Sequence, residues 1–172
     1  MLHNLARDME LAGPCQAWAV DITYIRTDEG FLYPSLLTDL RSRKTAGFHA
    51  GDTFESEGAV RALETALSEL PEGMFPVRHS DCGCQYCPRR YVEKPRDHGL
   101  AASMAGDTRC YENARAERLS GILKQEYSLG CSFRSKKQAL AAVGEAVSRY
   151  NTRRPRLSLN YKTPETMHRR AA

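Results

Sequence analysis

Long apolar runs are missing from this sequence. No stretch approaches the roughly 18 consecutive apolar residues of a membrane-spanning helix, so we expect no membrane segment. The first residues, Met-Leu-His-Asn-Leu-Ala-Arg-Asp, are followed by acids where a secretory signal peptide has its apolar segment. We therefore expect a cytoplasmic protein whose six cysteines are reduced thiols. No internal repeat is visible.

Acidic residues are scarce in the C-terminal quarter. Residues 131–172 carry ten Lys or Arg and two Glu, a balance of +8, whereas residues 1–130 have a balance of −4. A basic segment beside a mildly acidic body indicates a polyanionic partner, with nucleic acid the leading candidate. A solvated basic helix and tail explains the charge equally well. The 172 residues, 41% hydrophobic and 27% charged, are typical of one globular domain with a core or a domain with an arm.

The hydrophobic pattern predicts strands first and then helices interleaved with further strands. In the first strand, Trp18, Val20, Ile22 and Tyr24 form an apolar row, and Asp21 points to the opposite face. We expect Trp18 to be a core residue rather than a platform on which bases stack.

Pro34 predicts an interruption or an edge in the second strand. A capping-box pattern from Ser135 to Gln138 predicts the start of the last helix, whose apolar stripe is Leu140, Val143, Val147 and Tyr150. The expected strands are residues 17–26, 31–40, 45–50, 75–80 and 100–104, and the expected helices are residues 56–70, 113–127 and a helix from 135.

This element order favours a mixed α/β sheet with helices on its faces. We expect an N-terminal arm at residues 1–15, ending near Gly13-Pro14, a core at 16–150 and a basic segment at 151–172. In such a sheet the first and fourth strands can be neighbours. That pairing would bring Asp21, in the first strand, beside Asp81, which follows the fourth.

Three acids fit one site in this arrangement. Between Asp21 and Asp81 there are 59 residues, and 35 residues separate Asp81 from Glu117 on a predicted helix. Like charges repel, so three clustered carboxylates make sense when a divalent cation neutralises them. Mg²⁺ prefers oxygen ligands, and a pair of such ions about 4 Å apart can promote phosphoryl transfer.

Other interpretations compete at several positions. Asp39 is an alternative ligand to Asp21, although a structural role, paired with Arg41 or Arg43, fits it better. Lys124 lies two helical turns after Glu117 and can hold a phosphate or be an ordinary exposed lysine. The cysteines Cys82, Cys84 and Cys87, with His79 and His98 nearby, have irregular spacing for a zinc site, and loop residues are the favoured interpretation.

Several short motifs lie in order along residues 17–165. They are Trp18-x-x-Asp21-Ile22-Thr23-Tyr24-Ile25, His79-Ser80-Asp81-x-Gly83-x-Gln85-Tyr86, Ser103-Met104, Asn113-Ala114-x-x-Glu117 with Lys124-x-Glu126, Tyr150-Asn151-x-x-Arg154-Pro155, and Leu159-x-Tyr161-x-Thr163-Pro164. Each motif is weak alone. Together, in this order and with these gaps, they resemble the transposases of the IS3 insertion-sequence family, which share an integrase core.

The resemblance implies a ribonuclease-H-like fold, a mixed five-stranded sheet flanked by helices. It implies Asp21, Asp81 and Glu117 as catalytic metal ligands for Mg²⁺ or Mn²⁺, expected as two ions, and DNA cleavage and joining at insertion-sequence ends. The expected partners are DNA and further copies of the chain on that DNA. Supporting roles are expected for His79, Gln85 and Asn113, and DNA contacts for Lys124, Arg134, Lys136, Lys137, Arg153, Arg154 and Arg156.

The chain departs from the family pattern in places. The full transposases carry helix-turn-helix segments ahead of the core, so we expect end recognition to come from a separate protein or domain. Cys82 and Cys84 replace the usual residues after Asp81, and Arg118-Leu119-Ser120 follow Glu117 where the family favours aromatic residues. Two other functions stay open: a non-catalytic remnant that binds DNA, and a hydrolytic nuclease of the same fold.

Overall fold

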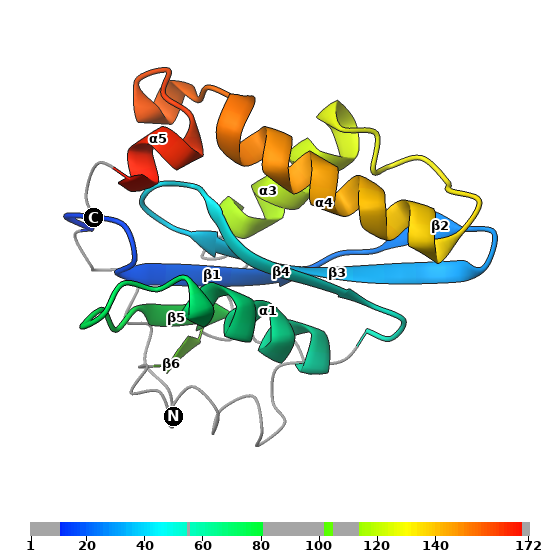
Figure 1. Ribbon diagram of the computed structural model, residues 1–172, viewed down its shortest axis with the longest axis horizontal. Coiled ribbons are helices and arrows are strands. Elements are labelled where there is room, and N and C mark those ends of the chain that lie inside the picture. The colour runs from blue at the N-terminus through cyan, green and yellow to red at the C-terminus, as the bar shows by residue number, and fades with distance from the viewer. Residues whose placement is uncertain (1–10, 55, 81–101, 105–113, 170–172) are drawn as a thin grey trace.

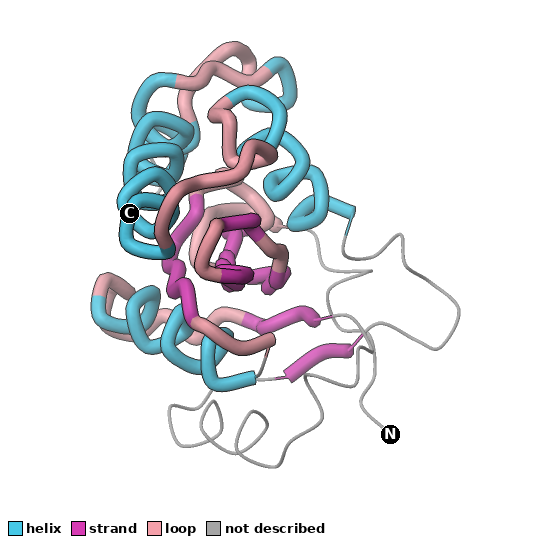
Figure 2. The backbone as a smooth tube through the Cα atoms, turned by 90° about the vertical axis from the view of Figure 1, so that its right-hand side faces the viewer, coloured by secondary structure: helices cyan, strands magenta, loops and turns pink. Residues whose placement is uncertain are grey.

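The computed structural model describes residues 11–54, 56–80, 102–104 and 114–169. One sheet lies between helices on its two sides (Figures 1 and 2). The backbone of His79 is described. Outside the described residues lie Asp81, Gln85, Asn113, His98 and the cysteines Cys82, Cys84 and Cys87.

The predicted mixed sheet with five strand positions is confirmed. The described part of the chain has six strands, but β1 and β2 lie end to end along β3 and occupy one position. β1 and β2 both pair antiparallel with one edge of β3, and β4 pairs with the other edge. β5 lies parallel to β1, and β6 lies parallel to β5. The strands are β1 (Ala17–Ile22), β2 (Ile25–Thr27), β3 (Gly30–Asp39), β4 (Thr45–Gly51), β5 (Val77–Ser80) and β6 (Ala102–Met104).

The expected first strand is divided opposite Pro34. Pairing with β3 stops at Ile22 and resumes at Ile25, and in the gap the Thr23 N–H donates to the Pro34 carbonyl at 3.0 Å. Proline has no N–H to return a ladder bond, which confirms the predicted interruption. The prediction of one strand running through Tyr24 is wrong, because Tyr24 lies in the break between β1 and β2 and its side chain is 50% exposed.

Helices cover both faces of the sheet. α1 (Ser56–Ser68) packs on one face against Trp18, Val20 and Leu37, so Trp18 is a core residue, as predicted. α3 (Ala114–Glu126) and α4 (Lys136–Arg153) cover the other face (Figure 1). The core on that side consists of Ile25, Leu32, Leu36, Leu119, Ile122, Leu123, Leu129, Ala139, Val143, Ala146, Val147 and Tyr150.

The start of α4 is capped as the sequence predicts, in part. The Gln138 N–H donates to Ser135 Oγ at 3.2 Å, but the Gln138 side chain accepts from the Arg134 N–H, also at 3.2 Å, so the reciprocal bond of a capping box is not formed. Leu140 was assigned wrongly to the buried stripe, because it is 45% exposed. Its predecessor Ala139 is buried instead, four residues before Val143.

The C-terminal residues fold back on the body. α4 continues beyond residue 150, and its buried Asn151 exchanges two hydrogen bonds with the Thr45 backbone, at 2.9 and 3.0 Å. A 3-10 turn (Leu157–Leu159) and α5 (Pro164–Arg169) follow. The predicted domain boundary at residue 150 stays a prediction.

Among the described residues, no helix combines the length and apolar character needed to cross a bilayer.

Candidate active site

The two faces of β1 have opposite characters, and this difference orients Asp21. Trp18 and Val20 point to the α1 side of the sheet. Ala17 and Ala19 point to the other side, where they meet Ala116 of α3. Side chains alternate along a strand, so Asp21 follows the two alanines and faces α3. The prediction that Asp21 lies opposite the apolar row is confirmed.

Small residues let α3 approach β1 closely. Ala116 is fully buried against Ala17 and Ala19. One turn later, the Ser120 hydroxyl donates to Asp21 Oδ2 at 2.5 Å. Glu117 stands three residues before Ser120, about 4.5 Å along the helix axis, and its side chain is exposed. The structure thus brings the Glu117 end of α3 to the strand end that carries Asp21.

Ser120 is a site residue that the sequence argument missed. It was noted only as a departure from the family's aromatic residues. The available signal was its position three residues after Glu117, since residues three or four apart share a helix face. Ser120 is 7% exposed and directs one oxygen of the half-buried Asp21 carboxylate. It is therefore suited to orienting that carboxylate.

The neighbouring strand leads toward Asp81. β5 ends at Ser80, and its pairing joins Ala17 to Val77 and Ala19 to His79, partners that differ by 60 in residue number. Asp21 and Asp81 differ by the same number. The predicted adjacency of the first and fourth strands is therefore confirmed, while Asp81 itself lies outside the described part of the chain.

Lys124 lies on the same face of α3 as Ser120. Its ammonium nitrogen is 4.2 Å from the centre of the Tyr24 ring, a cation–π geometry. With Thr23 and Ser120, it lines a small cavity beside the end of β1. The half-exposed Tyr24 ring thus holds Lys124 near Asp21, at the edge of the site. The contact of Lys124 with a phosphate stays a prediction.

Four arginines line a groove between α3 and the segment after α4. Arg154 forms a two-bond pair with Glu126, at 2.6 and 2.5 Å, and this hydrogen bonding lowers the pKa of the Glu126 carboxyl. The Arg156 guanidinium donates to the hydroxyl of Tyr150, whose pKa is raised by burial. Arg43 and Arg118 were not predicted as ligand-binding residues. The groove is lined by Arg43, Arg118, Ile122, Arg154, Pro155, Arg156, Leu157 and Ser158.

The other basic residues predicted to bind DNA do not all gather there. Arg134 and Lys137 are exposed near the N-terminal end of α4, and Lys136 forms an ion pair with Asp52 at 2.8 Å. Arg153 is exposed at the far end of the helix. An 18-residue helix is about 27 Å long, so the predicted residues form two separate basic regions.

Asp39 has the structural role that the sequence favoured. It is fully buried at the end of β3. Its carboxylate accepts the N–H groups of Cys15, Arg41 and Ser42 at 2.7, 3.1 and 2.7 Å, and the Ser42 hydroxyl at 2.8 Å. The contact with Arg41 is made through the backbone rather than the predicted side chain. Asp39 therefore fixes the turn after β3, away from Asp21.

Comparison with known proteins matches this architecture. The integrase core domain model matches residues 12–110, and a second integrase core domain model matches residues 94–164. The transposase InsF for insertion sequence IS3A of Escherichia coli (strain K12) is 37% identical over 139 residues, which is 81% of this chain and 48% of InsF. The transposase for insertion sequence element IS629 of Shigella sonnei is 32% identical over 152 residues, 88% of this chain and 51% of that protein.

Solved structures show the same fold. The HTLV-2 integrase catalytic core domain in complex with magnesium superposes with a TM-score of 0.71 at 19% identity, covering 92% of this chain and 99% of that one. The catalytic core domain of BIV integrase gives 0.62 at 15% identity, covering 91% and 95%. The chain spans about half the length of the curated relatives it matches. The chain therefore belongs to the integrase core domain family, and its sequence is similar to that of the IS3A and IS629 transposases.

Proposed function

We propose that this chain is a catalytic core that cuts and joins DNA during insertion-sequence transposition, with Asp21, Asp81 and Glu117 as its catalytic metal ligands. The observation that carries the proposal is the bond from Ser120 to Asp21, which sets the Glu117 end of α3 beside the end of β1. Its relatives named as transposases support the choice of DNA as substrate.

The strand register supports the inclusion of Asp81. β1 and β5 pair with a constant offset of 60 residues through Ala19 and His79. Two further residues at this offset give Asp21 and Asp81. In a parallel pair, residues at the same level have side chains on the same face of the sheet. We therefore propose that the second carboxylate joins the first on the α3 side, with His79, Gln85 and Asn113 supporting the site.

The donor set suits Mg²⁺ or Mn²⁺. Asp21 and Glu117 offer carboxylate oxygens, the ligands that these hard cations prefer. Asp21 is half-buried with one oxygen fixed by Ser120, and Glu117 is exposed on α3, three residues before Ser120. When bound, a pair of such ions stabilises the attacking and leaving oxygens of an in-line phosphoryl transfer. The HTLV-2 core was solved with magnesium, which supports this choice.

The remaining residues bind and orient the DNA in this proposal. Lys124, held over the Tyr24 ring, places a positive charge beside the carboxylates. The arginine groove, which includes Arg118 next to Glu117, receives the phosphate backbone. The second basic region, at the start of α4, provides a separate backbone contact. Such contacts give affinity that falls as salt is raised.

We further propose that the chain acts as an oligomer on DNA in the bacterial cytoplasm, bound to the nucleoid, with a helix-turn-helix protein or domain recognising the element ends. The HTLV-2 core was solved in trimeric and dimeric forms, which supports assembly as a property of the fold. The chain's coverage of about half of InsF is compatible with a further recognition domain.

A strand-transfer assay tests the function. Labelled duplex with a pre-cleaved 3′-hydroxyl end of the element is incubated with a plasmid target and Mg²⁺ or Mn²⁺. Wild type should give joined product, Glu117→Gln none, and Glu72→Gln, at an exposed position far from the site, as much as wild type. Cutting without joining would identify a hydrolytic nuclease. Salt-sensitive binding with no product, even after the helix-turn-helix partner is added, would identify a non-catalytic remnant.

A further inference from the structure

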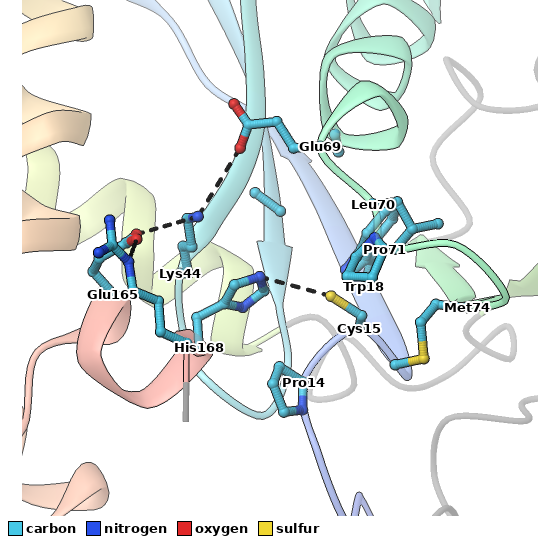
Figure 3. Close-up of a pocket in the computed structure, with 13 residues that line it drawn as sticks. Pro14, Cys15, Trp18, Lys44, Glu69, Leu70, Pro71, Met74, Glu165 and His168 are labelled. Atoms are coloured by element: carbon cyan, nitrogen blue, oxygen red, sulfur yellow. Dashed lines mark hydrogen bonds and ion pairs between the residues drawn. The ribbon is translucent and has the colours of Figure 1, made fainter. Parts of the chain in front are cut away.

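A second cluster of side chains able to bind a metal lies away from the candidate active site. Cys15, Asp39 and His168 each direct one ligand atom into it, and these three atoms lie within 4.8 Å of one another. The residues come from the segment before β1, the end of β3 and α5. Figure 3 shows His168 and Cys15 facing each other in a pocket near the end of α1.

Backbone contacts hold two of the three residues in place. Cys15 has a positive φ of 58°, and its N–H donates to Asp39 Oδ2 at 2.7 Å. Asp39 is fully buried and Cys15 is 6% exposed. The arrangement of thiol and carboxylate is therefore set by the folded backbone, rather than by two mobile surface side chains.

Ser42 orients the third residue. The Ser42 hydroxyl donates its hydrogen to Asp39 Oδ1 at 2.8 Å. Ser42 Oγ is therefore left to accept the N–H at Nδ1 of His168, 3.0 Å away. This assigns the neutral tautomer with a bare lone pair on Nε2. That nitrogen lies 3.6 Å from Cys15 Sγ. Metal-binding histidines commonly have their second ring nitrogen hydrogen-bonded in this way.

We propose that Cys15, Asp39 and His168 form a binding site for Zn²⁺ or a similar borderline cation. In a tetrahedron with sulfur at about 2.3 Å and nitrogen at about 2.0 Å from zinc, the two atoms are about 3.5 Å apart. The separation of Cys15 Sγ and His168 Nε2, 3.6 Å, is close to this distance. The fourth position opens to the pocket beside Pro14 and Met74, where a water can complete the coordination.

The ligands balance the charge of the ion. On binding, the metal replaces the thiol proton of Cys15, which passes to solvent. Thiolate and Asp39 carboxylate together then balance a divalent charge. The nearby Lys44 ammonium is offset by Glu165 at 3.2 Å and Glu69 at 4.0 Å (Figure 3). Binding would tie the segment before β1 to α5, independently of the catalytic carboxylates.

Cobalt substitution tests this site with the whole chain. Co²⁺ should bind one per chain and give thiolate-to-cobalt charge-transfer absorption, and Zn²⁺ should displace it. The band should be lost in Cys15→Ser and strongly reduced in His168→Gln. It should persist in Cys131→Ser, where the cysteine is exposed, and in the triple Ser variant at Cys82, Cys84 and Cys87. Circular dichroism confirms that each variant is folded.

Ser42→Ala gives a graded result, because it removes a hydroxyl that contacts both His168 and Asp39 but removes none of the three ligands. We expect a loss of about 10- to 100-fold in Zn²⁺ affinity. The proposal is overturned if the charge-transfer band survives Cys15→Ser, if it disappears only in the triple Ser variant, or if folded wild type binds no Co²⁺. That last result would leave the 3.6 Å contact as a simple thiol–imidazole hydrogen bond.

Discussion

Ser120 on α3 donates its hydroxyl hydrogen to Asp21 at the end of β1, across a separation of 99 residues in sequence. The bond connects a carboxylate that a strand positions with the helix that carries Glu117. Because it fixes one of the two oxygens of Asp21, it orients the carboxylate without contacting a substrate. Ser120 is accordingly a positioning residue in the proposed site.

Replacing Ser120 with alanine should lower kcat for strand transfer with little change in the KM for DNA. Removing a group that orients a metal ligand typically lowers metal affinity or activity 10- to 100-fold. We expect kcat to fall by a factor in that range. Ser120→Thr, which keeps the hydroxyl, should restore part of the activity. Ser148→Ala on the exposed face of α4 is the control. A loss in Ser120→Ala explained entirely by weaker DNA binding would contradict the positioning role.

The arginine groove should control the salt dependence of DNA binding. Each phosphate contact that is lost reduces the slope of log K against log salt by about 0.9. Arg43→Ala and Arg118→Ala should each reduce the slope by about that amount. Lys162→Ala, which does not line the groove, is the control. Affinities measured by fluorescence anisotropy across a salt series provide the slopes, and an unchanged slope in both variants would place the DNA elsewhere.

Asn151→Ala should strongly destabilise the fold. The change leaves the N–H and carbonyl of Thr45 without their side-chain partner inside the protein. An orphaned buried polar group costs about 1–3 kcal/mol, so we expect a loss of about 3 kcal/mol in the free energy of unfolding. Urea titration measures it, with Thr152→Ala at the adjacent exposed position as control. Equal midpoints for the two variants would refute the assigned role of Asn151.

Two glycine substitutions should have opposite effects on stability. A Cβ on Gly47 in β4 would lie 2.3 Å from the Ala62 carbonyl oxygen and 2.8 Å from the Ala66 nitrogen. These are backbone atoms of α1, so Gly47→Ala should force the helix away from the sheet and cost about 1–3 kcal/mol. A Cβ on Gly121 within α3 meets nothing within 4 Å.

Gly121→Ala should therefore stabilise the protein by up to about 1 kcal/mol, the difference in helix propensity. Thermal unfolding of both variants checks the pair. A stable Gly47→Ala protein would show that α1 does not pack on β4 as closely as described.

Much of the sheet follows from local pattern. Alternation along β1 predicted that Asp21 faces away from Trp18, and Pro34 predicted the interruption in the ladder. These features depend on neighbouring residues and on the chemistry of one side chain. The adjacency of the first and fourth strands was inferred from element order, and it is confirmed by the parallel pairing of β1 with β5.

Features that depend on tertiary contact were missed. The hydrogen bond between Ser120 and Asp21 joins residues from different elements. The spacing of Ser120 from Glu117 indicates a shared helix face, but it does not identify Asp21 as the partner. Leu140 was placed in the core because leucine is apolar, whereas the helix turns Ala139 inward to fit closely against its neighbours. The groove that gathers Arg43, Arg118, Arg154 and Arg156 likewise exists only after folding. The roles of Asp81, Glu117 and the basic residues remain predictions.

The central claim is that Asp21, Asp81 and Glu117 act as one catalytic unit. Its most direct measurement is single-turnover strand transfer by Asp21→Asn, Asp81→Asn, Glu117→Gln and the three pairwise double variants. Groups that act together are strongly non-additive, so each single change should reduce the rate on the order of 10³-fold and each double change by about the same factor. Full activity in Asp81→Asn, or losses that multiply in the double variants, would contradict a single three-carboxylate site.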